Sequence, residues 1–591
     1  MINQDAAHMH LDFSGGRTAM DKISESLLNE FSSEHAIVSL QEDKRFEHFA
    51  SFIVIKRHYP STFDTADVVV GEGGDTGIDG IAIIVNGSMI TDIDELENSG
   101  SLDVSFIFVQ AKTRPSFDSS VIGDFGHGVV DFFRDTPTLK RNQKISDMAA
   151  IQADLYTKRS SKFVHNPSLR LYYVTTGKWV GDKDLESRRQ AVIDDLQRTN
   201  LFRSVEFRPI DAEALQELYR QAKNAISNTF KFEKNIPLPQ IPGITAAYLG
   251  FMPAQDFIGL VQADDGEFLN SVFYDNPRDW QDYNPVNSEI KQTIESGNSN
   301  RFVVMNNGIT IIARKVQASG EIFTIQDYQI VNGCQTSHVL HDQRDKLTAN
   351  TLVPVRLIGT DNEDVINDII HATNRQTEIK PDQFFASQEF PKQLETYFQA
   401  YPQERRIYYE RRSRQYDRLP VEKTRVITHP NMIRAFAAMF LNEPHRTTRN
   451  YAMLTKRIGK EIFVKGHKYE PYYLAAFALN KLESMFRSHR IEAYYKPARF
   501  HILMALRMLG GEKDMPLHMN SQAMATYCNE IMGTLWDNEK ADKLISQAIE
   551  VITTVANGNF ERDNIRTDEF TEMVIAECSR LRVEKKKHKF P

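Results

Sequence analysis

The sequence predicts a multidomain protein that combines α/β and all-α parts: an N-terminal α/β domain, a central mixed α/β region and a C-terminal helical region. Its 591 residues are several times the length of an average domain, so more than one core is expected. Hydrophobic residues make up 41% and charged residues 25% of the chain, which is typical of globular proteins and excludes collagen-like or wholly disordered chains. Changes in the period of the hydrophobic pattern then divide the chain.

Residues 1–225 alternate between helical and strand-like patterns and are expected to form one α/β domain. Helical spacing of apolar residues predicts helices over 20–57, 121–134 and 183–198. Asn86-Gly87 predicts a hairpin turn of type I′, because both central residues of that turn need a positive φ. Runs rich in β-branched and aromatic residues predict strands at 67–70, 78–85, 88–92, 104–112, 169–176 and 204–209.

The rest of the chain divides at a proline-rich stretch. Three prolines fall within residues 226–245, which are therefore expected to be a linker. A mixed α/β region is expected over 246–427. From 428 to 591 nearly every apolar stretch has helical spacing, so this region is expected to be helical. It ends in a basic tail.

Nothing in the sequence predicts a membrane protein or an exported one. No run of about eighteen apolar residues occurs, and the first residues lack the basic and apolar segments of a signal peptide. Three cysteines in so long a chain cannot form a disulfide framework, and their spacing does not suit structural zinc. We therefore expect a cytoplasmic protein. A net charge of −8 gives no overall attraction for nucleic acid, although basic residues cluster locally over 405–418.

Asp79 and the tripeptide Gln110-Ala111-Lys112 form the first candidate site. Asp79 opens a predicted strand after a glycine-rich segment, and the tripeptide ends a later apolar strand. Side chains alternate along a strand, so Gln110 and Lys112 project from the same face. If Asp79 lies beside them, its carboxylate, the Gln110 amide oxygen and the Ala111 carbonyl offer oxygen ligands to Mg²⁺ or Mn²⁺. Lys112 would then serve a metal-bound water or a phosphate, and Asp75 is an alternative ligand.

This pattern resembles the PD-(D/E)xK nuclease superfamily over roughly residues 40–180, in the Mrr-like variant that has glutamine in place of a glutamate. The resemblance implies a restriction-endonuclease-like fold and a metal-dependent nuclease with Asp79, Gln110 and Lys112 as catalytic residues. An upstream helix in that family often adds an acid, and Glu47 fits this position. The alternative interpretation is a degenerate nuclease domain without activity.

Polar signatures rich in Asn, Gln and Arg recur among apolar strands between residues 270 and 420. Turn chemistry explains the Asn-Gly pairs within them, but not the amides and arginines that accompany these pairs. Such groups donate and accept in fixed planar geometries, so we expect them to bind a nucleic acid or nucleotide beside a stacking tyrosine. A buried hydrogen-bond network that holds loops together is the alternative. The candidate contacts are Asn307, Asn332, Gln335, Asn374, Arg375, Tyr408 and Arg411.

Four of these signatures are NNGIT (306–310), IVNGCQT (330–336), ATNRQT (372–377) and YYERR (408–412). In this order and spacing they resemble the AIPR family, named for abortive infection and phage resistance in bacteria. The resemblance spans roughly residues 240–560. It implies an anti-phage or restriction-linked role, and members of the family often carry an N-terminal nuclease-like domain.

Together the two resemblances predict a bacterial anti-phage protein whose N-terminal domain cleaves phosphodiester bonds, in DNA rather than RNA. A phage-derived trigger and an oligomeric state are both compatible with this prediction. The alternative is a non-catalytic sensor or adaptor that binds nucleic acid or a phage protein. A third class, an enzyme acting on nucleotides, is disfavoured as an NTPase because no GxxxxGK[ST] phosphate loop occurs.

Overall fold

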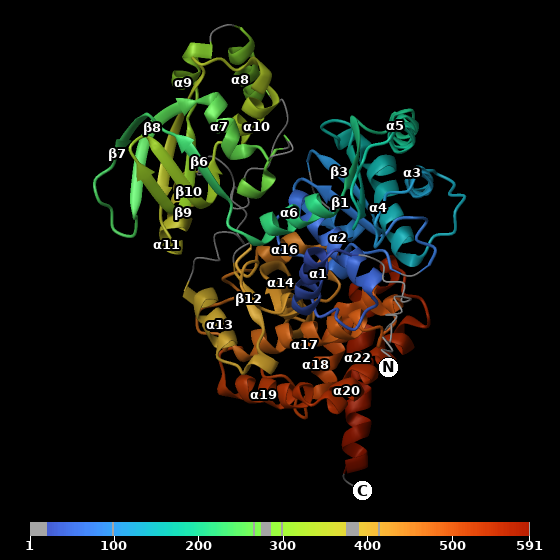
Figure 1. Cartoon of the computed structure of the whole chain (residues 1–591). Helices are drawn as coiled ribbons and strands as arrows, with labels where there is room; N and C mark the ends of the chain where they lie inside the picture. The colour runs from blue at the N-terminus through green and yellow to red at the C-terminus, as the bar shows by residue number, and fades with distance from the viewer. Residues whose placement is uncertain are drawn as a thin grey trace, which may run out of the picture.

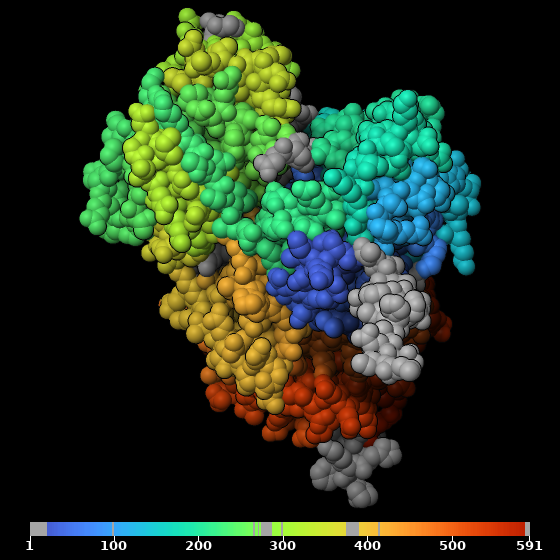
Figure 2. All heavy atoms as spheres, viewed as in Figure 1, coloured from blue at the N-terminus to red at the C-terminus, as the bar shows by residue number. Residues whose placement is uncertain are grey.

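The computed structural model contains three bodies, and Figures 1 and 2 show them in one view. It describes residues 20–589 except 72, 97–99, 264–265, 267, 274–284, 297–298, 374–388 and 412–413. We name these bodies the N-terminal body (20–225), the central body (226–373) and the helical body (389–589). The N-terminal and central bodies lie side by side, and both contact the helical body.

The N-terminal body is a five-stranded sheet with helices on both faces. Its main elements are α1 (Lys22–Glu34), α2 (Glu42–His58), β1 (Gly80–Val85), β2 (Ser88–Ile90), β3 (Val104–Lys112), α3 (Ser119–Phe132), α4 (Gln143–Lys158), β4 (Ser168–Thr175), α5 (Lys183–Gln197), β5 (Ser204–Ile210) and α6 (Ala212–Lys223). The strand order is β2-β1-β3-β4-β5; β1 is antiparallel to both neighbours, whereas β4 and β5 run parallel to β3. Both faces of the sheet are apolar, so α1, α2 and α6 cover one and α3, α4 and α5 cover the other.

The turn between β1 and β2 has the predicted conformation. Asn86 and Gly87 have φ values of 50° and 72°, and Val85 pairs with Ser88 across them. Because both central residues are left-handed, the two strands can twist together in a tight hairpin. This hairpin lies at the opposite end of β1 from Asp79.

The prediction of a strand at 67–70 is wrong. Its first residue instead ends a 3₁₀ turn, η1 (Thr65–Asp67), whose N-cap residue Asp64 accepts a hydrogen bond from the Ala66 N–H (3.0 Å). Val69 then forms an isolated bridge with Gly80. The side-chain cap favours a turn where the apolar run alone had indicated a strand.

The central body is built on a six-stranded sheet. Its elements are β6 (Ser227–Lys231), β7 (Lys234–Pro237), β8 (Ala246–Pro253), α7 (Ala254–Val261), η4 (Asn270–Phe273), α8 (Pro285–Glu295), α9 (Phe302–Met305), β9 (Ile309–Ser319), β10 (Ile322–Asn332), α10 (Cys334–Asp342), β11 (Leu352–Gly359) and α11 (Glu363–Thr373). The strand order is β6-β10-β9-β11-β8-β7, in which β9 and β11 are parallel and the other neighbours antiparallel.

Residues 226–245, expected to be a linker, instead supply the two edge strands of this sheet. β6 pairs with β10, and β7 pairs with β8. An edge strand has a partner on one side alone, so it tolerates Pro237 and mostly exposed side chains. The prolines of this stretch are the feature that had indicated a linker.

The helical body has one hydrophobic core that extends from Phe390 to Cys578. Its main elements are α13 (Glu389–Gln399), β12 (Tyr408–Glu410), β13 (Val426–Thr428), α14 (His429–Phe440), α15 (Arg446–Arg449), α16 (Tyr451–Thr455), α17 (Glu470–Arg487), α18 (Arg499–Gly510), α19 (Gln522–Trp536), α20 (Asn538–Ala556), α21 (Arg562–Ile565) and α22 (Asp568–Lys589). Residues 389–427, expected in the central region, therefore pack here, as the burial of Leu394 and Tyr409 shows. Within the described part of the chain, no helix is both long and apolar enough to span a bilayer.

Candidate functional site

Asp79 lies directly before β1 and is the centre of the first candidate site. Its main-chain N–H donates to the Val109 carbonyl (2.9 Å), which holds it beside the end of β3. The residue is 3% exposed. Its Oδ2 accepts hydrogen bonds from the side-chain amide of Gln110, the N–H of Ala111 (2.7 Å) and the ammonium of Lys112 (3.3 Å). The structure thus brings together the residues that form the core of this predicted site.

Strand geometry explains why these groups converge. Gly80 is opposite Val109 in the antiparallel ladder, so Asp79 falls level with the last residues of β3. Gln110 and Lys112 share one face of β3, and both side chains reach Asp79. The main-chain groups of Val109 and Ala111 point towards the same carboxyl residue.

Glu47, on α2, is the second acid of the site. It is 6% exposed, and the Lys44 ammonium donates to its two carboxylate oxygens at 2.8 and 2.9 Å. Burial and the charge of Asp79 raise the pKa of Glu47 to about 7, although Lys44 and Lys112 oppose the shift. Lys44 was not predicted from the sequence; its i, i+3 spacing to Glu47 on one helix face is the one signal that indicates it.

The contacts of Asp79 limit how it could hold a divalent cation, because three nitrogen donors already contact its Oδ2. Burial raises the pKa of Asp79 above its usual value, against the opposing effects of Lys112 and the Ala111 N–H. Among the described residues, no three His, Cys, Asp or Glu side chains are grouped closely enough to hold a metal ion. A cation would therefore need amide and main-chain oxygens as well as carboxylates, and Mg²⁺ and Mn²⁺ accept such ligands. The alternative ligand, Asp75, accepts a hydrogen bond from the Gly77 N–H (2.9 Å) and so closes its own turn.

Gly128 of α3 sets how closely the turn before Asp79 approaches this helix. A Cβ on Gly128 would lie 1.9 Å from the carbonyl oxygen of Thr76. We expect Gly128→Ala to displace that turn and to lower the free energy of unfolding by roughly 1–3 kcal/mol, the usual cost of overpacking. A thermal melt measures this as a decrease in Tm.

Gly533→Ala is the matched control for this prediction. Gly533 lies within α19, and a Cβ added there would meet no described atom within 4 Å. Alanine favours a helix over glycine by about 1 kcal/mol, so the Tm should stay constant or increase. A Gly128→Ala protein as stable as wild type would contradict the proposed close packing.

The predicted nucleic-acid residues of the central body hold neighbouring elements together. Asn332 ends β10, and its amide donates to the carbonyl of Thr373 at the end of α11 (2.8 Å). Gln335 of α10 accepts a hydrogen bond from the side-chain amide of Asn287 in α8 (2.7 Å). These contacts agree with the alternative interpretation, a hydrogen-bond network between loops.

Asn307 is exposed in the turn before β9. The next residue, Gly308, has a φ of 79°, and a Cβ on it would lie 2.9 Å from the Pro354 carbonyl oxygen. Close packing as well as backbone conformation therefore requires this glycine. Asn374 and Arg375 lie outside the described residues.

Tyr408 and Arg411 belong to the helical body and not to the central sheet. Arg411 has 9% of its side chain exposed, and its Nε donates to Glu395 of α13 (2.5 Å). The ring of Tyr408 lies 5.4 Å from the ring of Tyr416. Both side chains thus make contacts within the fold, and they belong to a different body from Asn307, which separates the predicted contacts into two groups.

The segment 410–418, described here by residues 410–411 and 414–418, joins the three bodies. It contacts α2 and the loop after it in the N-terminal body, and η4 and β10 in the central body. The pairs are Lys56–Asp417 (2.8 Å), Thr62–Glu410 (2.7 Å), Arg414–Ser271 carbonyl (3.1 Å) and Arg418–Asp327. The dense charge of this segment, interpreted from the sequence as a binding surface, thus forms contacts between bodies.

Comparison with known families gives one match. The model of the family described as AIPR protein matches residues 273–563. This range includes much of the central body and most of the helical body. No curated protein and no solved structure matches the chain.

Proposed function

We propose that this protein is a metal-dependent nuclease of bacterial phage defence, whose N-terminal body hydrolyses phosphodiester bonds in DNA rather than RNA. The match of residues 273–563 supports assignment to the AIPR family and suggests the defence role. The nuclease proposal depends on one observation: Gln110, Ala111 and Lys112 all donate to a single oxygen of buried Asp79. A cytoplasmic location and a phage-derived trigger are further parts of the proposal.

The order of elements supports this proposal. Helix α2 precedes β1, which follows Asp79; β3 ends in the Gln110-Ala111-Lys112 tripeptide, and helix α3 follows. This is the order that the nuclease resemblance implies. The acid Glu47, expected on the preceding helix, is close enough to Asp79 for the two charges to interact.

Each side chain has a role that its contacts permit. A bound Mg²⁺ or Mn²⁺ would polarise the phosphate and lower the pKa of a water molecule. Asp79, the Gln110 amide oxygen and the Ala111 carbonyl would hold the cation, with Glu47 beside them. The Gln110 amide donates to Asp79 here, so it must turn to present its oxygen instead. Lys112, with 34% of its side chain exposed, can reach a phosphate oxygen or the attacking water.

Metal binding tests the proposed site directly. We expect Mn²⁺ or Mg²⁺ to increase the Tm, because a ligand of the folded state stabilises it by about 2.7 kcal/mol at 100 times its Kd. Asp79→Ala should abolish the increase. Asp182→Asn is the matched control, since Asp182 caps α5 away from the proposed site and asparagine keeps the capping oxygen. An increase that persists in Asp79→Ala would place the metal elsewhere.

The pH dependence of stability tests the environment of Glu47. Its pKa of about 7 in the folded protein exceeds that of an unfolded chain, so it stabilises the fold below about pH 4.5 and this stabilisation is lost as pH rises through 7. Glutamine does not ionise, so Glu47→Gln should not show this loss of stability at high pH, which is at most about 3 kcal/mol in wild type. In EDTA, the Tm of this variant relative to wild type should be higher at pH 8 than at pH 5. Equal differences at both pH values would contradict the assigned pKa.

A second candidate function is a non-catalytic sensor or adaptor for nucleic acid or a phage protein. The observation that favours it is Gln110, a neutral amide whose N–H₂ donates to Asp79. Such an amide attracts a cation less strongly than a glutamate would. Binding of DNA without cleavage under any metal condition would support this candidate over the nuclease.

A further inference from the structure

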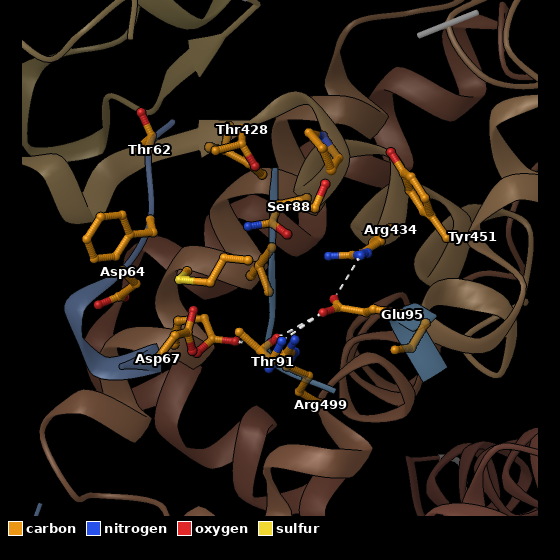
Figure 3. A pocket seen from close by; sticks show the side chains of 18 of the residues that line it. Thr62, Asp64, Asp67, Ser88, Thr91, Glu95, Thr428, Arg434, Tyr451 and Arg499 are labelled. Atoms are coloured by element: carbon orange, nitrogen blue, oxygen red, sulfur yellow. Dashed lines mark hydrogen bonds and ion pairs between the residues drawn. The ribbon is translucent and has the colours of Figure 1, made fainter. Parts of the chain in front are cut away.

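A cavity of about 1050 Å³ lies between the N-terminal body and the helical body (Figure 3). On the N-terminal side it is lined by η1, the β1–β2 hairpin and a 3₁₀ turn, η2 (Ile93–Leu96). On the other side it is lined by β13, α14, α16, α17 and α18. Ligand sites usually measure about 300–1,000 Å³, so this cavity can hold a nucleotide-sized molecule.

The two walls of the cavity carry opposite charges. Every lysine and arginine in its lining belongs to the helical body, and every carboxylate except Glu483 belongs to the N-terminal body. Two of the ion pairs between the walls are Arg434–Glu95 (3.1 Å) and Arg487–Asp64 (2.7 Å). Figure 3 shows Arg434 and Glu95 directed towards one another. The helical body therefore presents a basic wall to any molecule that enters.

The arginines of this basic wall have unused hydrogen-bonding capacity. A guanidinium group carries five N–H donors. Within the described part of the chain, the Arg487 side chain makes one hydrogen bond, to Asp64, and Arg499 lies 3.7 Å from Glu483, beyond hydrogen-bond distance. Each guanidinium group can therefore donate two parallel hydrogen bonds to a phosphate. The present contacts with carboxylates use at most one of these donors.

The same wall also carries an aromatic ring and amides. The Arg434 guanidinium lies 4.8 Å from the ring centroid of Tyr451, and Asn431 and Asn450 line the cavity beside them. Aromatic faces stack on nucleobases, and amides read their polar edges. These groups favour a ligand that combines phosphates with a base.

We propose that this cavity binds a nucleotide whose phosphates contact Arg487 and Arg499 and compete with Asp64 for Arg487. Because Asp64 and Arg487 belong to different bodies, binding replaces a contact between bodies by a contact to the ligand. Occupancy of the cavity and the contact between the two bodies are therefore linked.

This proposal does not depend on the proposed nuclease. Asp79 precedes the first residue of β1, whereas Val85, its last residue, lines the cavity. At roughly 3.3 Å per residue, the two sites are about 20 Å apart. Binding measured in EDTA thus reports on the cavity and not on a metal at Asp79.

Isothermal titration calorimetry of the full-length protein in EDTA tests the proposal, with ATP and inorganic tripolyphosphate as separate probes. We expect saturable binding of one ATP per chain, and weaker binding of tripolyphosphate because it lacks the base. Equal affinities would overturn the nucleotide assignment. No saturable binding of ATP would overturn the proposal as a whole.

Two substitutions with opposite expected effects sharpen this test. Arg499→Gln should weaken ATP binding by about tenfold or more through loss of its donors. Asp64→Asn should strengthen binding by about threefold, because Arg487 is then available to a phosphate. The asparagine keeps an oxygen for the Ala66 N–H, so the η1 turn is preserved.

The control is Arg580→Gln on α22, whose partners Glu577 and Glu584 lie outside the cavity lining. Its affinity for ATP should equal that of wild type. The ion-pair partner of Arg499, Glu483, belongs to the helical body, whereas the charge of Arg499 also acts on Asp67 of the N-terminal body. The Tm of Arg499→Gln is therefore measured as well, and an unchanged Tm will verify its folding. If neither Arg499→Gln nor Asp64→Asn changes the affinity for ATP, the proposed site is wrong.

Discussion

Alanine at Asp79 or at Lys112 is expected to lower metal-dependent cleavage of DNA by about a thousandfold or more. Asp79 is the acid on which the Gln110, Ala111 and Lys112 donors converge, so its removal eliminates the principal ligand of the proposed cation. Lys112 supplies the ammonium nearest to that carboxylate, at 3.3 Å, and its removal leaves the phosphate charge without this partner.

The assay compares plasmid DNA, single-stranded DNA and RNA in the presence of Mg²⁺, Mn²⁺ or EDTA. Asp182→Asn is the control, since Asp182 caps α5 in the same body and asparagine keeps the capping oxygen. This variant should cleave as wild type does. Full activity in Asp79→Ala or Lys112→Ala would reject the proposed site.

The Tm of an Asp79 variant shows whether its loss of activity comes from loss of the catalytic group or from unfolding. Burial raises the pKa of Asp79, so its ionised form costs stability at neutral pH when no metal is bound. We therefore expect Asp79→Asn to have a Tm in EDTA equal to or above that of wild type, although it is inactive. A lower Tm would indicate that Asp79 acts mainly in the fold.

Arg566→Ala is expected to lower the free energy of unfolding by roughly 3 kcal/mol, because it removes a cation that is paired with two carboxylates across the contact between two bodies. A thermal melt measures this as a decrease in Tm. Arg566 lies between α21 and α22, is 8% exposed, and joins the helical body to Asp92 and Asp94 of the N-terminal body. Its Nη1 donates to Asp92 at 2.8 Å and to Asp94 at 2.5 Å, and its Nη2 donates to Asp92 at 2.5 Å. Alanine would remove these three hydrogen bonds. The partly buried carboxylates of Asp92 and Asp94 would then keep longer ion pairs, with Arg562 and Arg449.

Acid should reduce this effect. Burial alone would raise the pKa of Asp92, but hydrogen bonds and the charge of Arg566 lower it well below its usual value. The stabilisation is therefore present above about pH 4 and is lost as the pH falls further. The difference in Tm between wild type and Arg566→Ala should therefore be smaller below about pH 4 than at neutral pH. Arg580→Ala, which removes an exposed pair on α22, should change the Tm by less than about 2 °C.

Local patterns in the sequence were sufficient for much of the N-terminal body. The Asn86-Gly87 turn was predictable because its chemistry depends on two adjacent residues, and the strands beside it follow from an unbroken apolar pattern. The meeting of Asp79 with Gln110 and Lys112 was expected only on the condition that their strands are neighbours, and the pairing of β1 with β3 meets this condition. Lys44 was missed because its one signal, the i, i+3 spacing to Glu47, is common to many surface ion pairs on helices.

Contacts between distant segments were not predictable. Residues 226–245 were interpreted as a linker because of their prolines, whereas an edge strand tolerates proline because one of its sides has no strand partner. The segment 410–418 resembled a ligand-binding surface because its charges have partners far away in the sequence, such as Lys56. No spacing rule encodes such pairs.

The sequence by itself therefore determined the five strands of the N-terminal body, its helices α1, α2, α3 and α5, the candidate residues around Asp79 and the resemblance to AIPR proteins. Helices α4 and α6 were not predicted. Tertiary structure alone decided where the bodies meet, which arginines find carboxylates, and that a charged cavity lies between them. The physical reason is one of range. Hydrophobic period and turn chemistry act over a few neighbouring residues, whereas an ion pair such as Asp64–Arg487 forms only after two separately folded bodies have docked.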